Sequence, residues 1–142
     1  MKPPGSHGNI IHQDYNWWQG FPTSCISIAI AIDAADRENG CTKFWPGTHK
    51  HGFLHEPGSF TGRIAEHYTT DEPYYLITEP GDVALFHCYT VHASDDNNSN
   101  KTRHQIFLSY NDSADGEHYQ AHREHYLQYV SPRDPSGTSY FR

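Results

Sequence analysis

The pattern of apolar and polar positions favours β-strands through most of this chain. Up to residue 116, short β-branched and aromatic runs alternate with Gly, Pro, Asn and Asp, which is typical of antiparallel sheet. The runs interpreted as strands are 9–14, 24–33, 42–45, 74–78, 82–87, 90–93 and 102–110. Their number and spacing predict an all-β fold, a double-sheet jelly roll whose interior can hold a ligand or a metal ion.

Large and small side chains alternate within the run 24–33. Successive strand residues point to opposite faces. This run therefore has an isoleucine face and a small-residue face, namely Ile28, Ile30 and Ile32 against Ser27, Ala29 and Ala31. Small residues facing inward would leave room inside a barrel. After residue 116 the spacing becomes helical, so we expect one C-terminal helix over 117–129.

Length and charge limit the possible partners. The 142 residues suffice for one domain, 1–142, with a core that needs no disulfide bonds. Ten lysines and arginines stand against 17 aspartates and glutamates, giving a formal net charge of −7. No basic cluster offsets this charge, so we expect no nucleic-acid partner.

Cysteines and apolar stretches indicate the compartment. Cys25, Cys41 and Cys88 lie within or beside apolar runs without the spacing of a zinc knuckle, which predicts buried free thiols. The most apolar stretch, 25–35, is too short to cross a bilayer, and the first residues lack the apolar core of a signal peptide. We expect a cytoplasmic protein with no membrane partner.

Two histidines and a carboxylate form a candidate metal site. His12 and Asp14 are two residues apart on a predicted strand, so both side chains would point to one face, and His92 follows a later strand. Such a set can bind one face of Fe(II) and leave the other positions open for a co-substrate and O₂. Taken alone, His12 and Asp14 could also be a hydrogen-bonded histidine in a sheet and an aspartate that begins a turn.

Arg103 and Ser94 are candidates for binding a carboxylate near that metal. Ser94 lies two residues beyond His92 and would point the same way along a strand. The planar guanidinium of Arg103 suits a bidentate grip on a carboxylate. The alternative for Arg103 is a surface ion pair with Asp95 or Asp96.

Four segments occur in an order that resembles a known family. They are His12-Gln-Asp14, then Asn-Gly-Cys-Thr-Lys-Phe-Trp-Pro-Gly-Thr-His-Lys at 39–50, then Gly-Asp-Val-Ala-Leu-Phe-His-Cys-Tyr-Thr-Val-His-Ala-Ser at 81–94, and Arg103. Together, from residue 11 to about 111, they resemble the phytanoyl-CoA dioxygenase family of Fe(II)- and 2-oxoglutarate-dependent oxygenases.

The resemblance implies a role for each of these residues. His12, Asp14 and His92 would be the iron ligands, and Arg103, assisted by Ser94, would bind the distal carboxylate of 2-oxoglutarate. The implied reaction hydroxylates a small organic substrate with O₂ and releases succinate and CO₂. Related halogenating enzymes have a small residue in place of the carboxylate, so the presence of Asp14 favours hydroxylation.

Aromatic residues directly after the metal pair are candidates for the substrate wall. Tyr15, Trp17 and Trp18 could exclude water and hold a substrate carbon near the iron, although packing is the commoner task of such side chains.

The start of the chain departs from the family pattern. Relatives carry a substantial section before the metal pair, with helices, an opening strand and part of the co-substrate pocket, whereas only residues 1–11 precede His12 here. Either the chain is a compact core or it is a fragment. The seven predicted strands, one fewer than the eight of a complete jelly roll, also indicate that part of the fold is missing. The sheet edge left exposed would favour a homodimer.

Other interpretations stay open at this point. Gly81 and His92 roughly fit the second motif of a cupin, but the first motif is not visible and Arg103 would have no role. The chain could also be a truncated jelly roll that binds a metal or ligand without turnover. A second possible metal site, His118, His122 and His125 on one helical face, is better explained as a solvated charged face.

Overall fold

Two small antiparallel sheets form the body of the protein. The computed structural model describes residues 1–55 and 64–130. Its strands are β1 (Ile26–Ala31), β2 (Thr42–Phe44), β3 (Tyr74–Tyr75), β4 (Val83–His87), β5 (His92–Ser94) and β6 (Gln105–Tyr110). The 3₁₀ turns are η1 (Asp14–Trp17), η2 (Thr48–His51), η3 (Glu66–Tyr68) and η4 (Ser113–Asp115), and the one α-helix is α1 (Tyr119–Val130).

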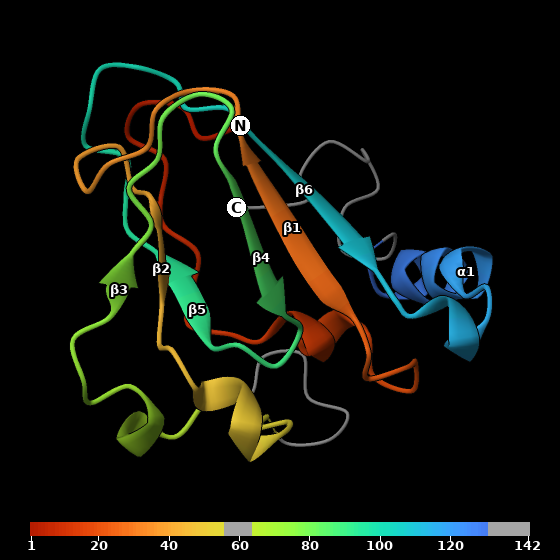
Figure 1. Ribbon diagram of the computed structural model, residues 1–142. Helices are drawn as coiled ribbons and strands as arrows, with labels where there is room; N and C mark the ends of the chain where they lie inside the picture. Colours follow the sequence, from red (N-terminus) through yellow and green to blue (C-terminus); the bar gives the residue numbers. More distant parts are fainter. Residues whose placement is uncertain (56–63, 131–142) are drawn as a thin grey trace.

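The strands pair in the orders β4-β1-β6 and β3-β2-β5 (Figure 1). Every pairing is antiparallel. The two sheets meet around a shared interior, where the rings of Phe44 from β2 and Phe86 from β4 lie 4.9 Å apart between centroids. The predicted all-β architecture, with one C-terminal helix, is confirmed.

Strand β1 turns its small residues inward, as its alternation predicts. Ser27, Ala29 and Ala31 are 2–3% exposed, whereas Ile32 beyond the strand is 47% exposed. Because β1 is the central strand of its sheet, neighbours on both sides fix its register. The resulting interior is lined by small side chains and by the aromatic rings that face them.

The prediction of a strand over residues 9–14 is wrong. Within this segment the structure has one isolated antiparallel β-bridge, between His12 and His92, and no continuous strand. The Gln13 N–H instead donates to Nε2 of His55, 3.2 Å away, and Asp14 begins the 3₁₀ turn η1. These alternative partners for the backbone end the sheet pairing immediately after His12.

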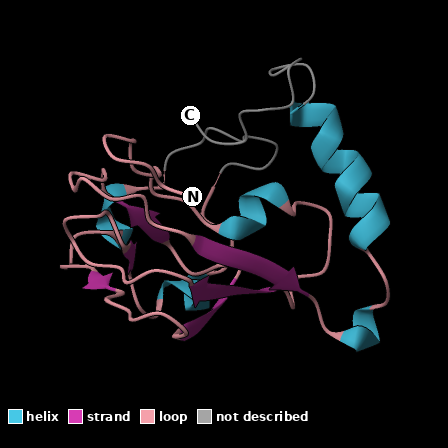
Figure 2. Ribbon diagram, turned by 90° about the horizontal axis from the view of Figure 1, so that it is seen from above, coloured by secondary structure: helices cyan, strands magenta, loops and turns pink. Residues whose placement is uncertain are grey.

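Helix α1 stands to one side of the sheets (Figure 2) and confirms the predicted C-terminal helix. Its contact with the body is aromatic. The ring of His122 stacks on Trp18 with 3.4 Å between centroids and a 10° interplanar angle, and His122 Nε2 lies 3.2 Å from the carbonyl oxygen of Trp17. Among the described residues, no helix has the length and apolarity needed to cross a membrane. The three cysteines are free and buried, as predicted.

Candidate metal centre

His12, Asp14 and His92 converge at one end of the barrel interior. Oδ1 of Asp14 lies 3.6 Å from Nε2 of His12 and 3.4 Å from Nε2 of His92. One ligand atom from each residue can be chosen so that all lie within 4.8 Å of one another, and this is the one such group among the described residues. Ligand atoms at right angles around an ion with bonds of about 2.1 Å are about 3 Å apart, so this set fits a single metal ion after a small contraction.

Both imidazoles present the same nitrogen to the centre. Nδ1 of His12 lies 2.7 Å from the carbonyl oxygen of Ile10, and Nδ1 of His92 lies 2.9 Å from that of Thr90. A carbonyl accepts only, so each Nδ1 carries the proton and donates it. Each Nε2 is then the atom available to a metal, which is the orientation that a backbone partner typically gives to a ligating histidine.

The centre is charged even without a metal. Burial alone would raise the pKa of the Asp14 carboxyl, but the neighbouring imidazoles of His92 and His12 hold that pKa well below its ordinary range. Burial opposes protonation of His92, yet the adjacent Asp14 carboxylate outweighs it and raises the pKa of this imidazole. A metal cation binding here would displace the proton from Nε2, so metal binding would release protons.

Backbone pairing between distant segments brings the two histidines together. The His12 N–H donates to the His92 carbonyl at 3.0 Å, and the His92 N–H donates to the His12 carbonyl at 2.9 Å. Gln13, which is fully buried, fixes the next residue: its side-chain amide donates to the carbonyls of Gly52 and Tyr89 at 2.9 and 2.7 Å. His12 and Asp14 therefore come together with His92 through one isolated bridge and a 3₁₀ turn. They do not lie on one face of a strand, as their spacing predicted.

Arg103 lies in a buried polar cluster. Its side chain is 7% exposed, with Nη2 donating to the carbonyl of Gly40 at 2.9 Å and Nη1 to Oε1 of Gln105 at 2.5 Å. Within the described part of the chain, its buried Nε–H has no hydrogen-bond partner. The alternative of a surface ion pair with Asp95 or Asp96 is wrong, because Arg103 is buried, Asp95 pairs with Lys43 and Asp96 contacts His7.

Lys2, which no sequence pattern singled out, lies in the same cluster. Its Nζ donates to Oγ of Ser94 at 3.0 Å and to the carbonyl of Gly40 at 3.3 Å. Burial and the nearby charge of Arg103 lower the pKa of Lys2 to about 8. Two cations and a serine hydroxyl thus gather here, an arrangement suited to an anion.

Ser27 is the other functional candidate that sequence reasoning did not assign. It faces inward from β1, and its hydroxyl donates to Oδ2 of Asp14. The available signal was a single hydroxyl in a row of otherwise apolar inward residues, Ala29 and Ala31. That signal indicates a polar partner in the interior without identifying it.

The aromatic candidates follow the metal pair directly, with Tyr15 and Trp17 in η1 and Trp18 just after it. The Tyr15 hydroxyl donates to the carbonyl of Phe21 at 2.8 Å, and its ring packs edge-on against Phe53 and Tyr89 at 5.3 and 5.0 Å. Trp17 packs against Tyr126 of α1 at 6.4 Å. Both side chains therefore have packing partners.

His118, which directly precedes α1, and His122 and His125 within it gather around one ring and form no metal-ligand group among the described residues. The rings of His118, His122 and His125 lie 6.2, 5.4 and 5.7 Å from Phe21.

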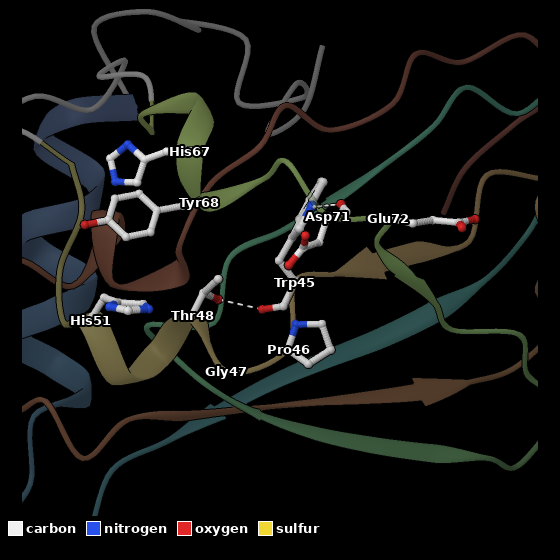
Figure 3. A pocket seen from close by; sticks show the side chains of 9 residues that line it. All are labelled: Trp45, Pro46, Gly47, Thr48, His51, His67, Tyr68, Asp71 and Glu72. Carbon is white, nitrogen blue, oxygen red and sulfur yellow. Dashed lines mark hydrogen bonds between the residues drawn. The ribbon is translucent and has the colours of Figure 1, made fainter.

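A surface pocket of about 270 Å³ lies apart from the metal centre, between η2 and η3 (Figure 3). His51, His67 and Tyr68 line one part of it, and Trp45, whose Nε1 donates to the Asp71 carbonyl at 3.0 Å, lines another. It contains none of the candidate site residues, so its size alone does not make it the reaction site.

Comparisons with known proteins find related sequences. The chain is 37% identical over 119 residues to the methylphosphonate hydroxylase of Gimesia maris, covering 82% of this chain and 44% of that protein. It is 36% identical over 110 residues to dioxygenase lolE1 of Epichloe uncinata, covering 77% and 42% respectively. The chain thus spans less than half the length of these relatives.

A solved structure shares the fold, and a family model matches the sequence. The non-heme alpha ketoglutarate dependent carbocyclase SnoK superposes with a TM-score of 0.68 at 23% identity, over 79% of this chain and 47% of that one. The model named phytanoyl-CoA dioxygenase (PhyH) matches residues 1–105. Since that match covers well over half of the chain and includes His12, Asp14, His92, Ser94 and Arg103, this chain belongs to the phytanoyl-CoA dioxygenase family.

Proposed function

We propose that this protein is an Fe(II)- and 2-oxoglutarate-dependent dioxygenase that hydroxylates a small organic substrate and releases succinate and CO₂. The observation that carries the proposal is the convergence of two imidazole Nε2 atoms and one carboxylate oxygen, from His12, His92 and Asp14, on a common point. These three residues would hold the iron, whose chemistry would be the activation of O₂ for oxidation of both organic substrates.

The chain's own residues would set the geometry. The two imidazoles and Asp14 would occupy one face of the iron, and the backbone carbonyls of Ile10 and Thr90 would keep both ring nitrogens correctly oriented. The rings of Phe44 and Phe86, which lie 5.8 and 5.0 Å from the His92 ring, would exclude water from that side.

Arg103, Ser94 and Lys2 would bind the distal carboxylate of 2-oxoglutarate. The unpartnered Nε–H of Arg103 supports this assignment, because a buried donor without an acceptor is costly and an anion would satisfy it. The Ser94 hydroxyl would supply a further donor to the same carboxylate. Lys2, whose Nζ donates to Ser94 Oγ at 3.0 Å and to the carbonyls of Gly40 and Asp95, would attract it through its positive charge. The 2-oxoglutarate keto-acid end would then face the metal.

Tyr15 and Trp17 would form part of the substrate wall, since η1 begins at the ligand Asp14. Two relatives are named for phosphonates, a methylphosphonate hydroxylase and a 2-aminoethylphosphonate dioxygenase, which are 37% and 33% identical to this chain. Others are named phytanoyl-CoA dioxygenases, so the names of the relatives include more than one substrate class.

Aerobic succinate formation tests the function. The purified chain, supplied with Fe(II), ascorbate and 2-oxoglutarate across a panel of small metabolites, is expected to release succinate and to add one oxygen atom to at least one panel member. Asp14→Ala is expected to abolish both products. Undiminished succinate release by that variant, or none by the unmodified protein, would contradict the proposal.

We also propose that two copies pair through the edge strand β6. It carries no charged residue, and its exposed apolar side chains are Ile106, Phe107, Leu108 and Tyr110, between 38% and 52% exposed. Uncharged apolar edges tend to acquire a partner strand. Small molecules rather than nucleic acids or membranes would be the other partners, and the charge of −7 supports the exclusion of nucleic acids. The location would be cytoplasmic.

A further inference from the structure

The two carboxylate oxygens of Asp14 have different partners. Oδ1 faces Nε2 of both His12 and His92, at 3.6 and 3.4 Å. Oδ2 accepts a hydrogen bond from the hydroxyl of Ser27. A carboxylate can bind a metal through one oxygen or through both, and here one of the two is already held by a protein donor.

Ser27 is better fixed in space than the residue it contacts. It is 3% exposed and sits in β1, the central strand, where it pairs with Phe86 of β4 on one side and Ser109 of β6 on the other. Asp14 instead begins a four-residue 3₁₀ turn, and its preceding residue makes no side-chain capping bond. The sheet can therefore orient the carboxylate through the serine hydroxyl.

The contact between Ser27 and Asp14 affects how many coordination positions of a bound metal ion stay open. Two histidines and a one-oxygen carboxylate leave half of an octahedral site open, which would accommodate the two donor oxygens of the keto-acid end of 2-oxoglutarate and one O₂ molecule. If Asp14 bound through both oxygens, the chelating keto acid would fill the site and the last position would be lost.

We propose that Ser27 is a positioning residue that restrains Asp14 to binding metal through Oδ1 alone. The inference rests on the proposed function for its purpose, because the open position matters only to an oxygenase. The contact itself, between a buried hydroxyl and the metal-facing carboxylate, acts on any divalent ion bound to this triad.

The first test measures Co(II) binding to the metal-free protein, by calorimetry and by the visible absorption of the bound ion. Ser27→Ala is expected to weaken Co(II) affinity by about 10- to 100-fold, as loss of a group that orients a ligand typically does, and to change the absorption spectrum. Ser109→Ala is the matched control. It removes a hydroxyl from the cross-strand neighbour on exposed β6, and affinity and spectrum should stay as in the unmodified protein.

Two variants of equal side-chain size, Ser27→Thr and Ser27→Val, distinguish the effect of losing the hydroxyl from the effect of changing side-chain volume. They also serve if the alanine variant does not fold. Ser27→Thr keeps the hydroxyl and should retain most of the Co(II) affinity and the original spectrum. Ser27→Val has the same shape without the hydroxyl and should behave as the alanine variant. Equal affinities and spectra for the threonine and valine variants would overturn the inference.

The outcome is distinguishable from a failure of the proposed function. If the unmodified protein binds Co(II) but forms no complex with 2-oxoglutarate, the oxygenase proposal fails while the threonine–valine comparison still decides the role of Ser27. If the 2-oxoglutarate complex forms and loss of the hydroxyl changes neither affinity nor spectrum, the oxygenase proposal stands and the inference about Ser27 is wrong.

Discussion

His12 and His92 are bound to each other by backbone hydrogen bonds in both directions, at 3.0 and 2.9 Å, and their ring centroids lie 4.1 Å apart. The two residues are 80 positions apart in the sequence (92 − 12 = 80). This single bridge adds His12 to the edge strand β5 at the metal centre, so local folding and metal-site geometry depend on the same contact. Substitutions that weaken the bridge should therefore disturb metal binding even when they leave all three ligands in place.

Gln13→Ala is a substitution directly beside this bridge, and its effect on the stability of the segment can be measured. Gln13 is fully buried, and its side chain bonds to the carbonyls of Gly52 and Tyr89 and to the N–H of Leu54. Gln13→Ala would leave these backbone groups without partners, and we expect the free energy of unfolding to fall by roughly 2–4 kcal/mol.

Urea denaturation of the metal-free protein measures this effect. Gln120→Ala, at an exposed position of α1, is the control and should change the free energy of unfolding by no more than about 0.5 kcal/mol. A Gln13 variant as stable as this control would show that the amide does not anchor the segment.

Lys2 should make 2-oxoglutarate binding depend on pH. Burial and Arg103 lower the pKa of Lys2 to about 8, so this side chain is charged below that pH and neutral above it. A dicarboxylate favours the charged form. We therefore expect affinity to be highest below pH 8 and to fall by about tenfold, equivalent to one unit of pKa shift, between pH 7 and pH 9.5.

Calorimetric titration of 2-oxoglutarate into the Co(II)-loaded protein at several pH values checks this expectation. Lys2→Met should bind more weakly at pH 7 and show a flatter profile across the same range. A profile that is identical in both proteins would remove Lys2 from the carboxylate site.

Strand β6 should determine the oligomeric state. Leu108 lies in the middle of the uncharged strand Gln105–Tyr110 and is 38% exposed. Leu108→Lys would place a charge in a paired edge, and we expect a dimeric protein to become monomeric in analytical ultracentrifugation. Tyr74→Lys on β3, at a site 60% exposed, should leave the dimer intact. A monomeric unmodified protein at high micromolar concentration would exclude the interface.

Sequence reasoning predicted what depends on local pattern. The strands from residue 24 onward, the inward small face of β1 and the helix α1 all follow from apolar spacing, and the structure confirms them. The grouping of His12, Asp14 and His92 is predictable because residue types and their order along the chain indicate it, and the structure brings the three together. Its mode of assembly is not predictable, because the backbone of Gln13 bonds to His55, a partner that no local pattern reveals.

Contacts between distant residues account for what was missed. Lys2 reaches Ser94 across 92 positions, and its place near the chain start gives it no motif. Ser27 contacts Asp14 only because β1 lies beside η1 in the folded barrel. Both assignments need the tertiary arrangement, which the periodicity of a single sequence does not specify.

Anaerobic addition of Fe(II) and 2-oxoglutarate to the purified chain, followed by visible spectroscopy, tests the central claim most directly. If His12, Asp14 and His92 hold one iron ion with adjacent open positions, the unmodified protein will show the charge-transfer band of a chelated keto acid at one equivalent of iron. Asp14→Ala and His92→Ala, confirmed as folded, will lack it. Absence of the band in the unmodified protein, or its persistence in both variants, would contradict the account.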